Sequence, residues 1–288
     1  GALEEITEGS NTGYRIAGRD AANYGDIGNN AVDLSYSSVN STTYGATGNY
    51  STAMGSFTTA SGNMSFAMGS NTRASGSVST AMGDYTTASG SGSTAMGFYT
   101  TASGNSGTAM GDATIASGNN STAIGFFTTA SGFVSTAAGY SSTASGDFST
   151  AMGDNTTAKS YAEVAIGLFN TDYTPASTSS WQSGDRLFVI GNGSSSSASD
   201  AMIVYKSGLA EFKNDMSIIG NLGLDDSEIR LRGLGDGNHY LKYQSDVGFD
   251  GPKLFGYGTI ALQTNDMEVV LRNGRMGVGT ASPTKGKL

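Results

Sequence analysis

From Ala46 to Ala165, alanine occupies every seventh position without exception, eighteen times in succession. Glycine follows two residues later from Gly48 to Gly153, sixteen times in succession. The seven-residue units alternate between two kinds, Ser-Thr-Ala-Met-Gly as at Ser79–Gly83 and Thr-Thr-Ala-Ser-Gly as at Thr86–Gly90. The repeat is therefore fourteen residues long, and a repeat this short and strict indicates a solenoid of stacked coils.

A heptad pattern is also typical of coiled coils, so that fold has to be excluded. Coiled coils need large apolar side chains at two positions of each heptad. Here the fixed positions are alanine and glycine, surrounded by serine, threonine and asparagine. Each of the sixteen regular glycines would also destabilise a helix by about 1 kcal/mol. The pattern excludes a coiled coil.

Alternation along a β-strand assigns the repeat positions to two faces, because successive side chains point in opposite directions. In one unit Ser79, Ala81 and Gly83 share a face, and in the other Thr86, Ala88 and Gly90 do. We expect these invariant faces to line the inside of a thin roll with two strands per coil, where only small side chains fit. Glycine also suits tight bends that need a positive φ.

The outward faces of the two strand types differ. One carries Ser61 and its equivalents, and the other carries a methionine-rich column. About eight coils at a spacing of about 4.8 Å would make an apolar stripe about 40 Å long. A monomer rarely exposes such a stripe, and the small interior side chains bury little apolar area. We therefore expect copies of the chain to associate along the stripe, the alternative being a cover formed by the chain's own N- or C-terminal segment. The expected interface residues are Met54, Met68, Met82, Met96, Met110, Ile124, Met152 and Ile166.

The alternating units resemble the head repeats of trimeric autotransporter adhesins, the YadA-like family, whose pattern is Asn-Ser-x-Ala-Ile-Gly followed by x-x-x-x-Ala-x-Gly. Residues Asn120–Gly125, followed by Ala130-Ser131-Gly132, match it fully, and most other coils carry Met in place of Ile. The resemblance covers about residues 46–170. It implies an all-β fold, a left-handed parallel β-roll that forms a homotrimer, and an adhesive role on a surface.

The flanking segments lack the regular repeat. We expect residues 1–45 to contain an N-terminal cap and a degenerate first coil, because Val32 and Val39 are in phase with the alanines. Four tyrosines would then close the open end of the roll, since solenoid ends need caps. They are Tyr14, Tyr24, Tyr36 and Tyr44. Residues 46–170 form the roll and 171–180 a linker.

Beyond the linker, longer strands replace the repeat, and we expect a β module at 181–222 and a β-rich fibre or shaft module at 223–288. Val269–Arg272 followed by Asn273-Gly274 predicts a hairpin. Residues Asn273–Pro283 resemble a segment common near the end of phage tail fibres and related surface fibres, where it often precedes a self-cleaving chaperone of the tailspike type. Residues 238–258 resemble shaft modules of that group. This resemblance implies a trimeric fibre.

Composition excludes several functional classes. The chain has 288 residues, no cysteine and a net charge of −9, which argues against a nucleic-acid partner. No apolar run approaches the ~20 residues of a membrane span, so we expect no membrane insertion. The N-terminus lacks the profile of a signal peptide, and we expect a piece of a longer protein.

Few residues could support chemistry. The sole histidine, His239, lies in a glycine-rich turn, and the aspartates Asp84, Asp112 and Asp154 recur without a calcium-binding pattern. We therefore expect no enzymatic activity, no cofactor and no metal.

Aromatic pairs at the turns are the candidate ligand-binding residues: Phe98, Tyr99, Phe126 and Phe127. Exposed aromatics stack on sugars or anchor protein partners, and the alternative is that they pack one coil on the next. The sequence thus predicts an extracellular adhesin or receptor-binding head for a cell-surface glycan or protein, on a cell or on the tail fibre of a virion or injection machine. A structural spacer is the first alternative. An ice-binding surface is the second, from the columns of Thr87, Ser89 and their equivalents.

Overall fold

A computed structural model describes residues 1–213 and, beyond them, the backbone of six strands. The chain divides into two compact units, Gly1–Met216 and Ser217–Leu288. In the part of the chain that is described there is no α-helix, and a single short 3₁₀ turn, η1, spans Ala21–Asn23. This confirms the predicted all-β parallel solenoid.

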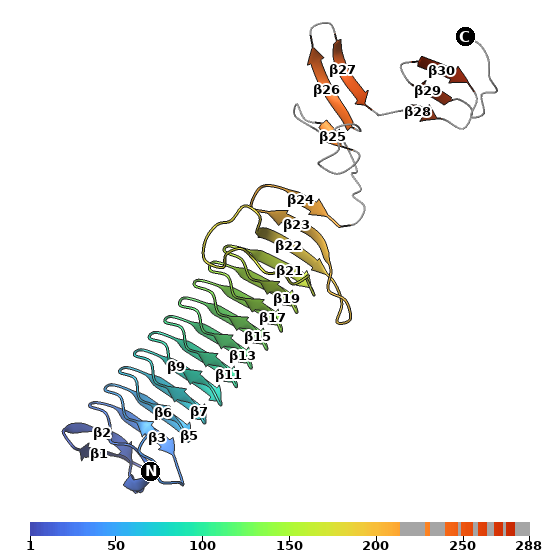
Figure 1. Cartoon of the computed structure of the whole chain (residues 1–288). Coiled ribbons are helices and arrows are strands. Elements are labelled where there is room, and N and C mark those ends of the chain that lie inside the picture. Colours follow the sequence, from blue (N-terminus) through green and yellow to red (C-terminus); the bar gives the residue numbers. More distant parts are fainter. Residues whose placement is uncertain are drawn as a thin grey trace. The chain divides into compact units, whose positions relative to one another are not determined.

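The fourteen-residue repeat forms one long and one short strand per coil (Figure 1). Each strand pairs in parallel with its equivalent one coil away, so that Met82 aligns with Met96 and Ala88 with Ala102. The long strands are β5 (Thr52–Ser56), β7 (Phe66–Ser70), β9 (Thr80–Asp84), β11 (Thr94–Phe98), β13 (Thr108–Asp112), β15 (Thr122–Phe126), β17 (Thr136–Tyr140), β19 (Thr150–Asp154) and β21 (Val164–Leu168). The short strands are β4 (Gly45–Ala46), β6 (Thr59–Ala60), β8 (Arg73–Ala74), β10 (Thr87–Ala88), β12 (Thr101–Ala102), β14 (Ile115–Ala116), β16 (Thr129–Ala130), β18 (Thr143–Ala144) and β20 (Thr157–Ala158).

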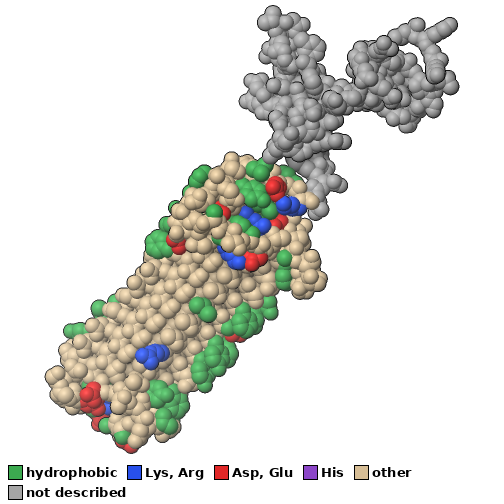
Figure 2. All heavy atoms as spheres, viewed as in Figure 1, with side chains coloured by type: hydrophobic (Ala, Val, Ile, Leu, Met, Phe, Trp, Pro, Cys, Tyr) green, Lys and Arg blue, Asp and Glu red, His purple; other side chains and the backbone are tan. Residues whose placement is uncertain are grey.

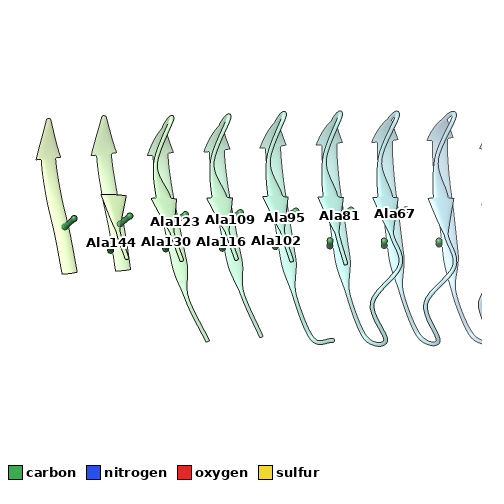
Figure 3. Close-up of a cluster of buried hydrophobic side chains, with 14 of the residues drawn as sticks. Ala67, Ala81, Ala95, Ala102, Ala109, Ala116, Ala123, Ala130 and Ala144 are labelled. Carbon is green, nitrogen blue, oxygen red and sulfur yellow. The ribbon is translucent and has the colours of Figure 1, made fainter. Parts of the chain in front are cut away.

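The interior of the roll is formed by the alanines, as predicted. All eighteen repeat alanines are at most 1% exposed, and those of the long and short strands lie between the two strand stacks (Figure 3). Beside them lie two columns of hydroxyl side chains, Ser79 with its equivalents and Thr86 with its equivalents, which are also buried. Most of these hydroxyls have no hydrogen-bond partner among the described residues, although Ser51 and Ser79 donate to the carbonyls of Gly48 and Gly76. The interior is therefore narrow and partly polar.

The glycines of the two units have different roles, whereas the sequence predicted that both line the inside of the roll. Gly90 and its equivalents are buried, whereas Gly83 and its equivalents, the penultimate residues of the long strands, are exposed or half-buried. Gly97, for example, has a φ of +129°, and a Cβ built on it would lie 1.9 Å from the carbonyl oxygen of Gly111. Glycine is required there by backbone conformation and by the approach of the next coil, and not by burial inside the roll.

The turns place many larger residues in the left-handed region of backbone space. One column contains Met64 and Val78, with φ of 54° and 57°, and another contains Tyr99 and Phe127, with φ of 52° and 54°. The left-handed conformation is unfavourable for residues other than glycine, asparagine and aspartate. Asn120, with a φ of 57°, occupies the first column at the coil that matches the adhesin repeat fully.

An antiparallel hairpin and the first long strand cap the N-terminal end. The hairpin consists of β1 (Leu3–Glu8) and β2 (Asn11–Ile16), and β3 (Val32–Tyr36) links it to β5. Asp33, and not Val32, aligns with Ala53, so the predicted phase of the first coil was wrong. The spacing from Asp33 to Ala53 is twenty residues rather than fourteen, because the connection between β3 and β5 is longer than in the other coils.

An ion-pair network fills this cap where the sequence predicted tyrosines. Arg15 is buried and contacts Glu8 at 3.0 Å and Asp33 at 3.2 Å, and its guanidinium lies 4.8 Å from the ring centroid of Tyr24. Tyr24 is buried, but Tyr14 and Tyr36 are exposed, so they do not close the roll. A buried arginine needs such paired carboxylates, since an unpaired charge would be costly to bury.

The segment after the roll continues its sheet. β22 (Arg186–Asn192) pairs in parallel with β21, and β23 (Asp200–Tyr205) and β24 (Ala210–Phe212) follow as antiparallel strands. The expected linker 171–180 packs against turns of the roll, where Thr178 accepts a backbone hydrogen bond from Asp147. Residues 186–212 are therefore part of the same sheet, whereas the sequence predicted a separate module at 181–222.

In the second unit, six strands form two antiparallel sheets of three. The first contains β25 (Glu228–Arg230), β26 (Tyr240–Asp246) and β27 (Phe249–Phe255). The second contains β28 (Thr259–Gln263), β29 (Glu268–Arg272) and β30 (Arg275–Gly279). The pairing of Arg272 with Arg275 confirms the predicted hairpin. His239 lies outside the described residues.

Candidate functional site: the methionine face and the aromatic turns

The outer face of the long strands carries the predicted apolar column. Parallel pairing aligns five methionines of consecutive coils, and Ile124, Ala138, Met152 and Ile166 continue the column toward the C-terminal end. The five are Met54, Met68, Met82, Met96 and Met110. We call these nine residues the methionine face.

The methionine face is not covered by the described parts of the chain. Met96, Ile124 and Met152 are 39%, 41% and 45% exposed, and the other members are half-buried by their neighbours. The terminal segments that could have covered it pair instead at the two ends of the sheet, through β3 and β22. The alternative that the described segments of the same chain cover the stripe is therefore wrong, and the face is left available to a partner.

The aromatic pairs lie at the ends of the long strands, next to the methionine face. Phe98 is the last residue of β11, two positions after Met96, and Tyr99 follows in the left-handed turn. Phe126 and Phe127 occupy the same positions two coils further on. Figure 2 shows hydrophobic side chains gathered along this edge of the roll, beside a broad face with few charged side chains.

These aromatics are exposed and also packed on one another. Tyr99 and Phe127 are 52% and 54% exposed. Within each pair the ring centroids are 4.4 Å apart and the rings are nearly perpendicular. Between coils, Tyr99 stacks on Tyr85 at 4.8 Å and Phe126 on Tyr140 at 5.2 Å. About half of each of these two side chains is therefore open to solvent, and the stacked pairs link neighbouring coils.

The outer face of the short strands carries hydroxyl groups. Thr87 and Ser89 flank the buried Ala88, and the same pattern recurs in most coils. The serines are mainly exposed, but Thr59 is buried and the other threonines of the column are half-buried. Arg73 and Ile115 replace threonine in two coils. The threonine column that the ice-binding alternative requires is therefore neither fully exposed nor continuous.

A polar cluster closes the C-terminal end around Glu163, a residue that was not predicted from the sequence. Glu163 is fully buried, and its Oε2 accepts hydrogen bonds from the backbone N–H groups of Lys159 and Ser160, each at 2.8 Å. Its Oε1 has no partner among the described residues. Glu163 lies fourteen residues after Ser149, in the buried serine column, so the period itself could have predicted that this carboxyl is inside.

Burial governs the protonation of this cluster. Burial raises the pKa of the Glu163 carboxyl above its ordinary value, although the Ser160 and Lys159 N–H groups oppose this. It also raises the pKa of the Tyr173 hydroxyl to about 12 and lowers that of the Lys206 ammonium. Lys206 donates to Ser160 Oγ at 2.8 Å and to the Arg186 carbonyl at 3.1 Å. Burial therefore disfavours the charged forms of all three side chains, and hydrogen bonds to Ser160 and Arg186 hold Glu163 and Lys206 in the cluster.

We expect Glu163→Gln to remove a pH dependence from the stability of the roll. An acid whose pKa is raised on folding stabilises the fold below its ordinary pKa, and that contribution is lost as pH rises through the raised value. The Tm of the glutamine variant relative to that of the wild type should therefore rise as pH increases above the ordinary carboxyl pKa of about 4. Thermal unfolding followed by circular dichroism at several pH values measures this, and a difference independent of pH would contradict it.

A depression of about 360 Å³ beside this cluster is lined by Thr171, Arg186, Asp200 and Lys213, among others. Its polar groups are already engaged, since Arg186 donates to the Thr171 carbonyl at 2.7 Å and pairs with Asp200 at 3.3 Å. The described residues contain no group of histidine, cysteine or carboxylate side chains that could hold a metal ion. None of the described helical segments could cross a membrane.

One known family model matches the roll. Residues 46–72, 74–100, 102–128 and 130–156 match the family model described as the YadA head domain repeat, two copies. Successive matches begin 28 residues apart, which is two coils. No curated protein matches the chain. With the parallel solenoid, these matches support the predicted YadA-like head, whereas the likeness of residues 273–283 to phage fibres stays a prediction.

Proposed function

We propose that residues 46–170 form the head of a homotrimeric, non-enzymatic surface adhesin. The observation that carries this is the methionine face, an uncovered apolar column on a roll whose repeats match the YadA head family. Continuous apolar strips of this length are rarely left in water. In a threefold assembly each methionine face packs against its two copies, and the interface residues are those predicted from the sequence. The family resemblance implies an extracellular location.

We further propose that the aromatic turns bind a cell-surface glycan or protein. Tyr99 and Phe127 are about half exposed, and aromatic rings are favourable surfaces for sugar rings and for protein anchors. The two turns lie two coils apart, at about 10 Å. Three copies around an axis would add avidity to a weak single site where the ligand is dense enough for simultaneous engagement.

A structural spacer is the second candidate, and the stacking between coils favours it. Tyr99 with Tyr85, and Phe126 with Tyr140, hold neighbouring coils together, and each such pair contributes about 0.5–1.5 kcal/mol beyond its burial. A spacer would need these contacts and no ligand.

Replacing Phe98, Tyr99, Phe126 and Phe127 together with serine separates the two candidates. The adhesin proposal predicts that binding to a glycan array or to cells is lost, while the trimer remains and its Tm changes little. The matched control replaces Phe133 and Phe148, which also pack on each other, at 5.4 Å, but outside these two turns. Binding should survive in the control. If the wild type binds no ligand and the Tm of the serine variant falls sharply, the result favours the spacer.

A further inference from the structure

The methionine face has a chemical property that its packing role does not require. At the same register position Met110 is followed by Ile124, and Met152 by Ile166, so isoleucine is accepted there by the same fold. The adhesin head pattern that the chain resembles also has isoleucine at this position. Isoleucine and methionine are both large and apolar, but only methionine carries a thioether that oxidants convert to a polar sulfoxide.

We propose that the methionine face is a reversible oxidation site that controls assembly of the chain. The inference rests on the proposed trimer. The oxidant is hydrogen peroxide or an organic hydroperoxide: the O–O bond breaks, the terminal oxygen forms a bond to the thioether sulfur, and the other oxygen leaves, after proton transfer, as water or as the corresponding alcohol. The sulfur is oxidised by two electrons and the peroxide is reduced by two.

The exposure of the column makes the unassembled chain the reactive form. Met96 and Met152 are 39% and 45% exposed in the single chain, within reach of a small oxidant. Met64, which lies in a turn outside the methionine face, is 57% exposed and serves as an internal reference for reactivity. Assembly along the methionine face would bury the column, whereas Met64 would stay exposed to solvent.

Oxidation would place a strongly hydrated acceptor on each thioether of the column. Each sulfoxide carries a strong acceptor, and the neighbours along the column are thioether and alkyl side chains at the same register, as for Met82, Met96 and Met110. A buried acceptor without a donor opposes burial. Oxidised chains should therefore stay apart, and methionine sulfoxide reductases acting on both sulfoxide epimers should restore assembly.

The test uses the whole chain, unfolded, treated with hydrogen peroxide and refolded after removal of the oxidant. The matched variant replaces the six column methionines (Met54, Met68, Met82, Met96, Met110 and Met152) with isoleucine and keeps the other five. We expect oxidation to raise the chain concentration needed for half-assembly by at least about 100-fold in the wild type, and to leave the variant unchanged. Treatment with both reductases and a thiol reductant, which supplies two electrons per sulfoxide and is oxidised to a disulfide while the oxygen leaves as water, should reverse the effect.

The outcomes separate this inference from the proposed function. If oxidised wild type assembles as the reduced chain does, or if the oxidised isoleucine variant also fails to assemble, the inference is wrong and the trimer stands. If reduced wild type does not assemble at all, the proposed function itself is wrong. In the assembled protein, mass spectrometry after brief peroxide treatment should find sulfoxide at Met64 and little at Met96. Equal rates at the two positions would overturn the inference.

Discussion

Gly97→Ala is expected to destabilise the roll by about 3 kcal/mol or more, the sum of a strained backbone and a forced displacement of the next coil. At this position φ is +129°, and a Cβ would lie 1.9 Å from the Gly111 carbonyl oxygen and 2.9 Å from its carbonyl carbon. Both obstacles are backbone atoms, so no side-chain rotation relieves them. Chemical denaturation of the assembled protein measures the loss.

Gly92→Ser is the matched control for this prediction. Gly92 also has a positive φ, of +66°, but the nearest atom to a Cβ added at this position is the end of the Ser106 side chain, at 3.5 Å. The equivalent residue of the next coil is Ser106 itself, with a φ of 52°. We expect a destabilisation of about 1–2 kcal/mol, which comes from the left-handed backbone alone. Equal stability of Gly97→Ala and Gly92→Ser would show that the spacing between coils does not demand glycine.

Met96→Asp is expected to abolish assembly. Within one chain the side chain at this position is 39% exposed, so a carboxylate there does not clash with the interior of the roll. In the proposed trimer the carboxylate would face its two copies in an apolar interface, and removing each charge from water costs several kcal/mol. Analytical ultracentrifugation should find no trimer at concentrations where the wild type is fully assembled.

Met64→Asp is the control for charge itself. Met64 is 57% exposed, lies in a turn with a φ of 54°, and is not part of the methionine face. Aspartate tolerates the left-handed conformation better than methionine does. The Met64→Asp chain should therefore assemble normally. Loss of the trimer in both variants would mean that an added charge prevents assembly wherever it lies, and not because it is buried at the interface.

The sequence was sufficient to predict the interior and the outward methionine column, because both follow from one period and from alternation along a strand. Ala81 and Ala88 are buried and Met82 points outward, as their positions predict. Alternation failed at Gly83, where a φ of +123° departs from the regular strand geometry on which the rule depends. The partly exposed glycine at the end of the strand could be recognised only from the structure.

The ends of the roll were the least predictable parts, since they depend on contacts across long stretches of sequence. Asp33 aligns with the buried Ala53, and its carboxylate is paired with Arg15, eighteen residues earlier. Nothing in the repeat predicts that pair. Glu163 differs, because its phase with Ser149 was visible in the sequence. A charged residue in phase with a buried column is a usable signal for a polar end cluster.

The mass of the folded chain in solution tests the central claim most directly, which is that the methionine face is buried between three copies. Light scattering coupled to size exclusion should give three times the chain mass of 29.3 kDa, with no folded monomer at lower concentrations. A single-chain mass for a protein that retains the β-sheet circular dichroism of the roll would contradict it, because the methionine face would then be stable in water without a partner.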